Sequence, residues 1–254
     1  MPTPPEPTPL VLESGDPLAV RVTAAIEGGD VPGLRRLLDD HPGLAAGRVV
    51  ARCAGAGERS LLHLATDWPG HRPRTAQVIR ALVEAGADPM ARFVGAHAET
   101  PLHWAASNDD VEAVDALVAA GADLAAPGAV IGGGTPLADA CAFGQWRAAR
   151  RLLELGARPD LHEAAALGLL DRVAEFLAAT GSLAADELTA AFWSACHGGQ
   201  LTTARYLLSD RVDVDWIGYG DATPLDAALT SGNEELIGWL RSVGAHARAE
   251  LPPA

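Results

Sequence analysis

Short apolar stripes recur along the chain in pairs, and a polar or glycine-containing turn separates the two stripes of each pair. The clearest pair lies in residues 100–121, TPLHWAASNDDVEAVDALVAAG. Its apolar positions are Leu102, Ala105 and Ala106, then Val111, Val114, Leu117 and Val118. A spacing of three and four residues within each stripe predicts two short α-helices, which pack antiparallel because the break at residues 108–110 is only a turn long.

The ends of these helices are marked by residues with specific backbone preferences. Thr100 is a good N-cap, and Pro101 suits the first helical position because its missing N–H and fixed φ cost nothing there. Gly121 closes the second helix, since glycine readily takes the left-handed conformation. The same frame recurs at residues 135–156 and 223–244, with threonine 21 residues before glycine each time.

The segment TPLHWAA followed by AAGAD, together with its recurrence in register, resembles the ankyrin repeat, whose signature is T-P-L-H-x-A and whose period is about 33 residues. The resemblance implies an all-α fold, an ankyrin-repeat solenoid of paired antiparallel helices with short β-type fingers. We expect a Pro-rich N-terminal tail at residues 1–17, an ankyrin repeat domain at 18–246 and a C-terminal tail at 247–254. About seven repeats are expected, near residues 20–46, 58–93, 98–130, 133–159, 160–186, 188–219 and 221–246.

The second predicted repeat contains an insertion. Its opening Ser60 lies 26 residues before Gly86, against 21 in the repeats that begin with Thr-Pro-Leu, so five extra residues separate its helices. An insertion at this place forms a loop on one rim of a solenoid, where binding residues often lie. The binding candidates in this loop are Asp67, Trp68, His71 and Arg72.

The fingers that join consecutive repeats differ in length. The finger before Thr100 is a long one and contains the binding candidates Phe93 and His97. The finger between the fourth and fifth repeats is reduced to residues 158–160, and the next one is also short. These deletions predict a notch on the concave side, of the kind that small ligands occupy.

In ankyrin repeats the fingers and the exposed positions of the inner helices carry binding, so the resemblance implies further candidates. Trp104 is the best anchor among them, because aromatic residues dominate binding hot spots. The full set is Trp104, Asn108, Asp139, Phe143, Glu163, Trp193, His197 and Trp216.

Asp139 and Glu163 occupy the same position in neighbouring repeats, and His197 lies one repeat further along. Two carboxylates about 10 Å apart, the packing distance of adjacent helices, can act as acid and base if burial moves their pKa values toward neutrality. In the alternative interpretation both carboxylates hydrogen-bond to finger backbone or pair with nearby arginines. The sequence leaves both interpretations open.

His63, His103 and His162 share the histidine position of the repeat signature, but this row predicts no metal site. Ligands in neighbouring repeats are too far apart to share an ion with bonds of about 2 Å, and Ala138 interrupts the row. We expect these histidines to bridge repeats through hydrogen bonds. No metal and no cofactor is expected.

Composition narrows the classes of function. The 254 residues are 48% hydrophobic but only 5% aromatic, which suits stacked helices better than a sheet enzyme with a bulky core. The net charge is −14 and every basic residue is arginine, which argues against nucleic acid or anionic membrane as a partner and indicates a GC-rich, bacterial source. Without a transmembrane run, a signal peptide or a disulfide framework, we expect a cytoplasmic protein.

The resemblance first implies a binding scaffold that recognises a protein or peptide partner through its concave face and fingers. The alternative is a small-molecule binder or an enzyme that uses the notch at repeats three to six, with Asp139, Glu163 and His197 as acid–base residues. No nucleophile motif, metal spacing or phosphate loop supports a particular reaction. Enzymatic activity is therefore left open.

Overall fold

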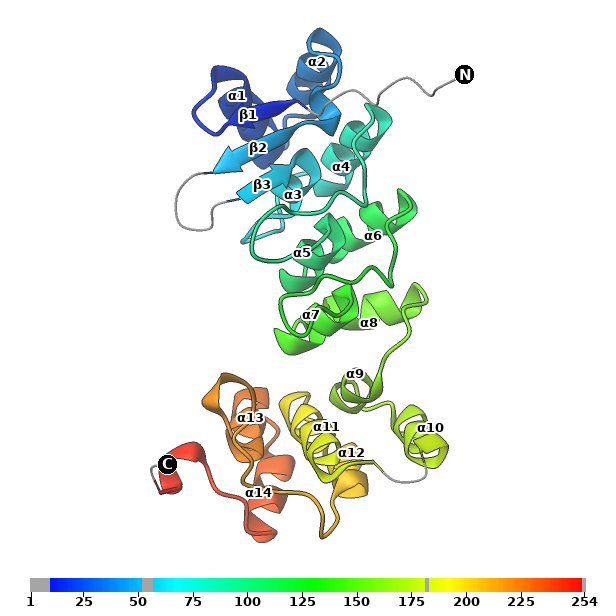
Figure 1. The fold of residues 1–254 in the computed structure, drawn as a ribbon, viewed down its shortest axis with the longest axis vertical. Coiled ribbons are helices and arrows are strands. Elements are labelled where there is room, and N and C mark those ends of the chain that lie inside the picture. Colours follow the sequence, from blue (N-terminus) through cyan, green and yellow to red (C-terminus); the bar gives the residue numbers. More distant parts are fainter. Residues whose placement is uncertain (1–9, 52–56, 181–182, 253–254) are drawn as a thin grey trace. The chain divides into compact units, whose positions relative to one another are not determined.

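The computed structural model describes residues 10–51, 57–180 and 183–252, and the chain divides into two compact units, Met1–Ala157 and Arg158–Ala254 (Figure 1). In the described ranges, fourteen α-helices follow one another as seven pairs. The pairs of the first unit are α1 (Pro17–Glu27) with α2 (Val31–Asp40), α3 (Leu61–Thr66) with α4 (Thr75–Glu84), α5 (Pro101–Ser107) with α6 (Val111–Ala119), and α7 (Pro136–Ala142) with α8 (Trp146–Glu154). The pairs of the second unit are α9 (Leu161–Ala166) with α10 (Leu170–Thr180), α11 (Ala185–His197) with α12 (Leu201–Leu207), and α13 (Pro224–Ser231) with α14 (Glu234–Ser242).

The helix starts follow the expected Thr-Pro frame. Thr100, Thr135 and Thr223 each precede a proline at the beginning of α5, α7 and α13. The hydroxyl of Thr223 accepts the N–H of Asp226 at 3.2 Å, which satisfies one of the free donors at the helix start. Among the described residues, no helix has both the length and the apolar character needed to cross a membrane.

Within every pair except α3 and α4, the chain reverses through one residue with positive φ. This residue is Gly144 between α7 and α8 (φ 68°) and Gly199 between α11 and α12 (φ 70°). Between α5 and α6 it is Asp109 (φ 54°), whose carboxylate accepts the N–H of Ala148 at 2.7 Å. The hydrogen bond to the next pair offsets the cost of the left-handed conformation, which aspartate tolerates better than most residues.

Small apolar residues let neighbouring helices approach closely. Leu102, Ala105 and Ala106 are fully buried where α5 packs between α3 and α7. In the second unit, α11 packs between α9 and α13 and contributes the larger buried rings of Phe192 and Trp193. The inner helices therefore form the centre of each unit.

A small sheet precedes the second helix pair, with strand order β1 (Val11–Glu13), β2 (Arg48–Ala51) and β3 (Gly57–Ser60). β1 runs parallel to β2, and β2 runs antiparallel to β3. The chain is therefore regular before residue 17, where we expected a tail, because the backbone of β1 hydrogen-bonds to β2 and Pro17 begins α1. Five of the six prolines of the expected tail lie in residues 1–9, outside the described ranges.

Helix α11 also differs from expectation. It begins at Ala185, ahead of the start near residue 188 expected for the sixth repeat, and has 13 residues against six to eight in α3, α5, α7, α9 and α13. Asp186 and Glu187 lie in its first turn, where negative charge is favourable because the helix N-terminus carries partial positive charge. The inner helix of this pair therefore begins within residues that we expected to connect two repeats, and its first turn carries two carboxylates.

Candidate functional site

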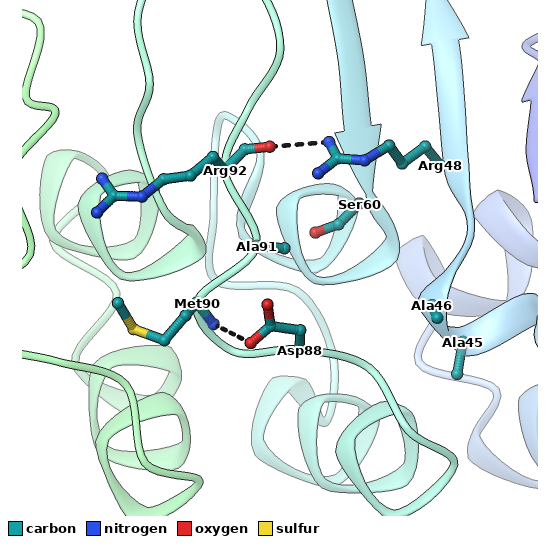
Figure 2. Close-up of a pocket in the computed structure, with 8 residues that line it drawn as sticks. All are labelled: Ala45, Ala46, Arg48, Ser60, Asp88, Met90, Ala91 and Arg92. Atoms are coloured by element: carbon teal, nitrogen blue, oxygen red, sulfur yellow. Dashed lines mark hydrogen bonds between the residues drawn. The ribbon is translucent and has the colours of Figure 1, made fainter. Parts of the chain in front are cut away.

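One pocket of the first unit has a cavity volume of about 340 Å³. It is lined by Ala45, Ala46, Arg48, Ser60, Asp88, Met90, Ala91 and Arg92 (Figure 2). The Arg48 guanidinium donates to the carbonyl oxygen of Arg92 at 2.8 Å, and Asp88 accepts the N–H of Met90 at 2.8 Å. The Arg92 guanidinium donates to the carbonyl oxygen of Pro127, in the next finger. These groups join loops of neighbouring repeats, which is a structural role.

A second pocket of the first unit, of about 350 Å³, is lined in part by Asp67, a predicted binding residue. One carboxylate oxygen of Asp67 lies 3.0 Å from a guanidinium nitrogen of Arg59, and the other accepts the N–H of Trp68 at 2.9 Å. The guanidinium of Arg59 lies 5.8 Å from the ring centre of Trp104. Asp67 is thus satisfied within the chain.

The insertion loop contacts both neighbouring helix pairs. The ring Nε2 of His71 lies 3.0 Å from the carbonyl oxygen of Asn108, and Arg72 forms an ion pair of 3.5 Å with a carboxylate of α1. Trp68 differs, because 79% of it is exposed. Phe143, after α7, is 48% exposed. These two rings are the predicted residues of the first unit best placed to contact a partner.

Phe93 and Trp104 form an aromatic cluster with His63. The ring centroids of Phe93 and Trp104 lie 5.5 Å apart, and those of His63 and Trp104 lie 4.8 Å apart. His97, from the same finger as Phe93, is exposed. The cluster packs the finger on the inner helices and leaves Trp104 only partly accessible.

Two histidines of the repeat signature bridge neighbouring repeats. Nε2 of His63 lies 3.1 Å from the carbonyl oxygen of Glu99, and Nε2 of His103 lies 3.3 Å from that of Gly134. Burial lowers the pKa of His63 to about 3 and the pKa of His103 to about 4, so both rings are neutral near pH 7. The predicted hydrogen-bonded role is confirmed for these two histidines and is wrong for His162, whose ring makes no hydrogen bond to a described residue.

Asp139 is fully buried in α7, not exposed on the concave side as expected. Neither carboxyl oxygen has a hydrogen bond of normal geometry in the described part of the chain. Burial, and then the charge of Glu99, raise the pKa of Asp139 to about 7, while the backbone of Val130 favours the charged form. Its position differs from expectation because the neighbouring finger residues Glu99 and Val130 approach the carboxyl group.

The other two acid–base candidates lie in the second unit. Glu163 accepts the N–H of Asp160 at 2.8 Å, and Asp160 accepts the N–H of Glu163 at 2.8 Å, which forms a capping box at the start of α9. His197 stacks on Trp193, with ring centroids 5.2 Å apart. Since Asp139 belongs to the other unit, the acid–base arrangement stays a prediction, while the capping box agrees with the structural interpretation of Glu163.

Four rings form a continuous row in the second unit. His197, Trp193, Tyr219 and Trp216 follow one another with centroid separations of 5.2, 5.2 and 6.1 Å. Trp193 is buried, whereas Tyr219 is 49% exposed. The row therefore leads from the core of α11 out to the finger before α13.

A pocket of about 520 Å³ adjoins this row, and we name it the acid–aromatic pocket. Its lining residues are His162, Asp186, Glu187, Ala190, Trp216, Ile217, Gly218 and Tyr219. Three consecutive helix pairs contribute to it, through α9, α11 and the finger before α13. Converging carboxylates, a histidine and aromatic rings in one concavity are what a specific binding site needs.

A family model described as ankyrin repeats (3 copies) matches residues 62–160 and 161–250. The chain belongs to the ankyrin repeat family. No curated protein matches it.

The ankyrin match begins at residue 62, so α1, α2 and all three strands of the sheet precede the matched region. The small sheet is thus a feature of this chain beside its ankyrin repeats. Ankyrin repeats generally act as modules of protein–protein interaction, which directs attention to their fingers and inner helices.

Sequence reasoning missed most of the acid–aromatic pocket. Of its lining residues, only Trp216 was predicted. Tyr219 follows Trp216 by three residues in one ankyrin finger, and this pair of aromatic residues could have indicated a binding finger from the sequence. No sequence signal brought Asp186 and Glu187 to that finger, because folding places the start of α11 beside it.

Proposed function

We propose that this chain is a binding scaffold of seven ankyrin repeats that recognises a protein or peptide partner through its inner helices and fingers. The seven helix pairs in the described ranges support the repeat count. The absence of lysine supports a bacterial source, and the acidic composition supports a protein that binds neither nucleic acid nor membrane. Three widely spaced cysteines without a disulfide framework support a cytoplasmic location. We keep the repeat boundaries expected from the sequence as part of this proposal, and open the sixth repeat at Ala185, where α11 begins.

The observation that carries the proposal is the exposed end of the aromatic row. Tyr219 and Trp216 lie on a finger, border a concavity and are backed by the buried ring of Trp193. Partly exposed aromatic rings with rigid support contribute large contact area at little entropic cost, and such residues dominate binding hot spots.

The test is a selection of peptides from a random displayed library on the purified full chain, followed by measurement of each dissociation constant by fluorescence polarisation. Tyr219→Ala is expected to weaken binding at least tenfold, which corresponds to about 1.4 kcal/mol. Tyr206→Ala is the matched control, because Tyr206 is also 49% exposed but lies on the outer helix α12. Equal affinities of the two variants, or no selected peptide, would contradict the proposal.

The alternative function is small-molecule binding or catalysis, with Asp139 of the first unit as an acid–base residue. One observation favours it, namely the raised pKa of Asp139, about 7, which suits proton transfer near neutrality. A thermal-shift screen against metabolites tests it. A ligand that stabilises the wild-type chain but not Asp139→Asn would support this function.

A further inference from the structure

We propose that the acid–aromatic pocket receives an arginine side chain of the partner, an inference that rests on the proposed function. The occupant is thus a flexible partner segment with an accessible arginine. Aromatic faces, unpaired carboxylates and a buried ring nitrogen without a partner each point to this chemistry.

The aromatic wall presents two rings at right angles. Trp216 and Tyr219 have an interplanar angle of 88° and a centroid separation of 6.1 Å. A guanidinium group stacks favourably on the face of either ring through cation–π attraction. The chain uses this interaction elsewhere, since Arg172 lies 4.4 Å from the ring centre of Phe176.

Glycine holds one of these rings in place. A Cβ atom at Gly218 would overlap the ring of Trp216, so the absence of a side chain lets the indole pack on the finger backbone. The backbone N–H of Gly218 donates to the carbonyl oxygen of Ala222 at 3.0 Å, which closes the finger. The aromatic wall is therefore positioned before a ligand arrives, which reduces the ordering cost of binding.

The same pocket is lined by two carboxylates from the first turn of α11. Asp186 accepts the N–H of Glu187 at 3.0 Å, and the Glu187 carboxylate makes neither a hydrogen bond nor an ion pair with other described residues. The helix dipole accounts for acidic residues at this turn, but it does not account for aromatic rings in the same pocket. A planar guanidinium can bind a carboxylate with two parallel hydrogen bonds while it stacks on a ring.

His162 supplies an independent observation. Its Nδ1 atom is buried and has no hydrogen-bond partner among the described residues, although the ring lines the pocket. A buried polar atom without a partner is unfavourable, and Nδ1 becomes able to accept a guanidinium N–H when the ring turns it toward the pocket. Arginine has five such donors, so it can serve the carboxylate and the imidazole together.

Charge also selects the occupant. The eight residues that line the pocket include two carboxylates and neither arginine nor lysine, and the whole chain has a net charge of −14. An anionic or apolar ligand would leave the carboxylates unpaired. Lysine would satisfy the charge but lacks the planar group that matches both the rings and a carboxylate.

The experiment uses the peptides selected on the full chain, each resynthesised with citrulline in place of arginine. Citrulline keeps the shape and removes the charge, so we expect at least tenfold weaker binding. Glu187→Gln should weaken the arginine peptide by a similar factor, and citrulline should then cause little further loss. Glu235→Gln is the matched control, because Glu235 is an exposed acidic residue in the first turn of the outer helix α14.

Peptides that depend on Tyr219 but bind equally well with citrulline would overturn the arginine inference and leave the scaffold proposal intact. Enrichment of lysine instead of arginine would overturn it as well. If the library selects no peptide, the scaffold proposal fails. The arginine inference is then tested by titrating the chain with N-acetylarginine amide and, separately, with N-acetylcitrulline amide. The NMR shift of the Trp216 indole reports binding of each compound in the pocket. Equal shifts from the two compounds would reject the inference.

Discussion

The indole nitrogen of Trp193 donates a hydrogen bond to the backbone carbonyl oxygen of Ala222, 2.9 Å away. Trp193 lies on the inner helix α11, and Ala222 ends the finger before α13, so the bond fastens this finger to a helix of the preceding repeat. The same indole meets the ring of Tyr219 edge-on at 5.2 Å. The position of the exposed Tyr219 ring thus depends on the buried Trp193.

Trp193→Phe removes this hydrogen bond and keeps an aromatic ring. We expect the free energy of unfolding to fall by about 0.5 to 1.5 kcal/mol, because the Ala222 carbonyl loses one of its two donors and keeps the N–H of Gly218. Backbone amides of residues 213–222 should exchange faster, as measured by hydrogen–deuterium exchange. Trp239→Phe is the control, since its indole packs on Phe192 but makes no hydrogen bond among the described residues. Unchanged exchange in the finger of Trp193→Phe would show that the bond does not hold it.

Asp139→Asn tests the effect of burying a carboxyl group. Its pKa is raised from 3.8 to about 7, so between these pH values the folded state binds the proton more tightly than the unfolded state. The stabilising contribution is present at low pH and is lost as pH rises through about 7. Asparagine carries no charge at any pH, so we expect the variant to gain about 2 to 4 kcal/mol relative to wild type at pH 8 and little at pH 4.

Urea-induced unfolding of both chains at pH 4, 6 and 8 measures this difference. His63 contributes with the opposite sign, because its lowered pKa removes stability as pH falls below 6.5, but this contribution is common to both chains and cancels. A stability difference that stays constant from pH 4 to pH 8 would contradict a raised pKa at Asp139.

Two glycines of the second unit should respond to alanine in opposite directions. A Cβ atom at Gly198 would overlap the backbone carbonyl oxygen of Ala166, whereas one at Gly238, in α14, meets no atom within 4 Å. Gly198→Ala is expected to lower the free energy of unfolding by about 1 to 3 kcal/mol, because α9 and α11 must separate. Gly238→Ala should raise it by about 0.5 to 1 kcal/mol through helix propensity. Thermal unfolding followed by circular dichroism measures both, and stabilisation by Gly198→Ala would contradict the close packing of these helices.

The helices could be predicted because their signals are local. Thr100 and Pro101 determine where α5 begins, and the apolar spacing that follows determines which face is buried. The bridging role of His63 was equally accessible, since the repeat frame places it beside the next finger. The strand β1 was not predictable, because Val11 pairs with Arg48, a partner 37 residues away that no local pattern specifies.

The candidate site was predicted only in part. Trp193, His197 and Trp216 were expected to contribute to binding, and they belong to the aromatic row. Asp139 was expected on the surface and is buried, since exposure at its repeat position depends on how closely the neighbouring fingers approach.

By itself, the sequence determined the repeat frame, the helix caps, the apolar faces and the strong negative charge, because each follows from residues within a few positions of one another or from composition. Only the tertiary structure decided which polar groups converge. His162, Glu187 and Tyr219 come from three successive helix pairs, and they line one pocket because stacking brings two inner helices and a finger together. Packing between repeats also buries Asp139, which raises its pKa, and brings the indole of Trp193 to the carbonyl oxygen of Ala222.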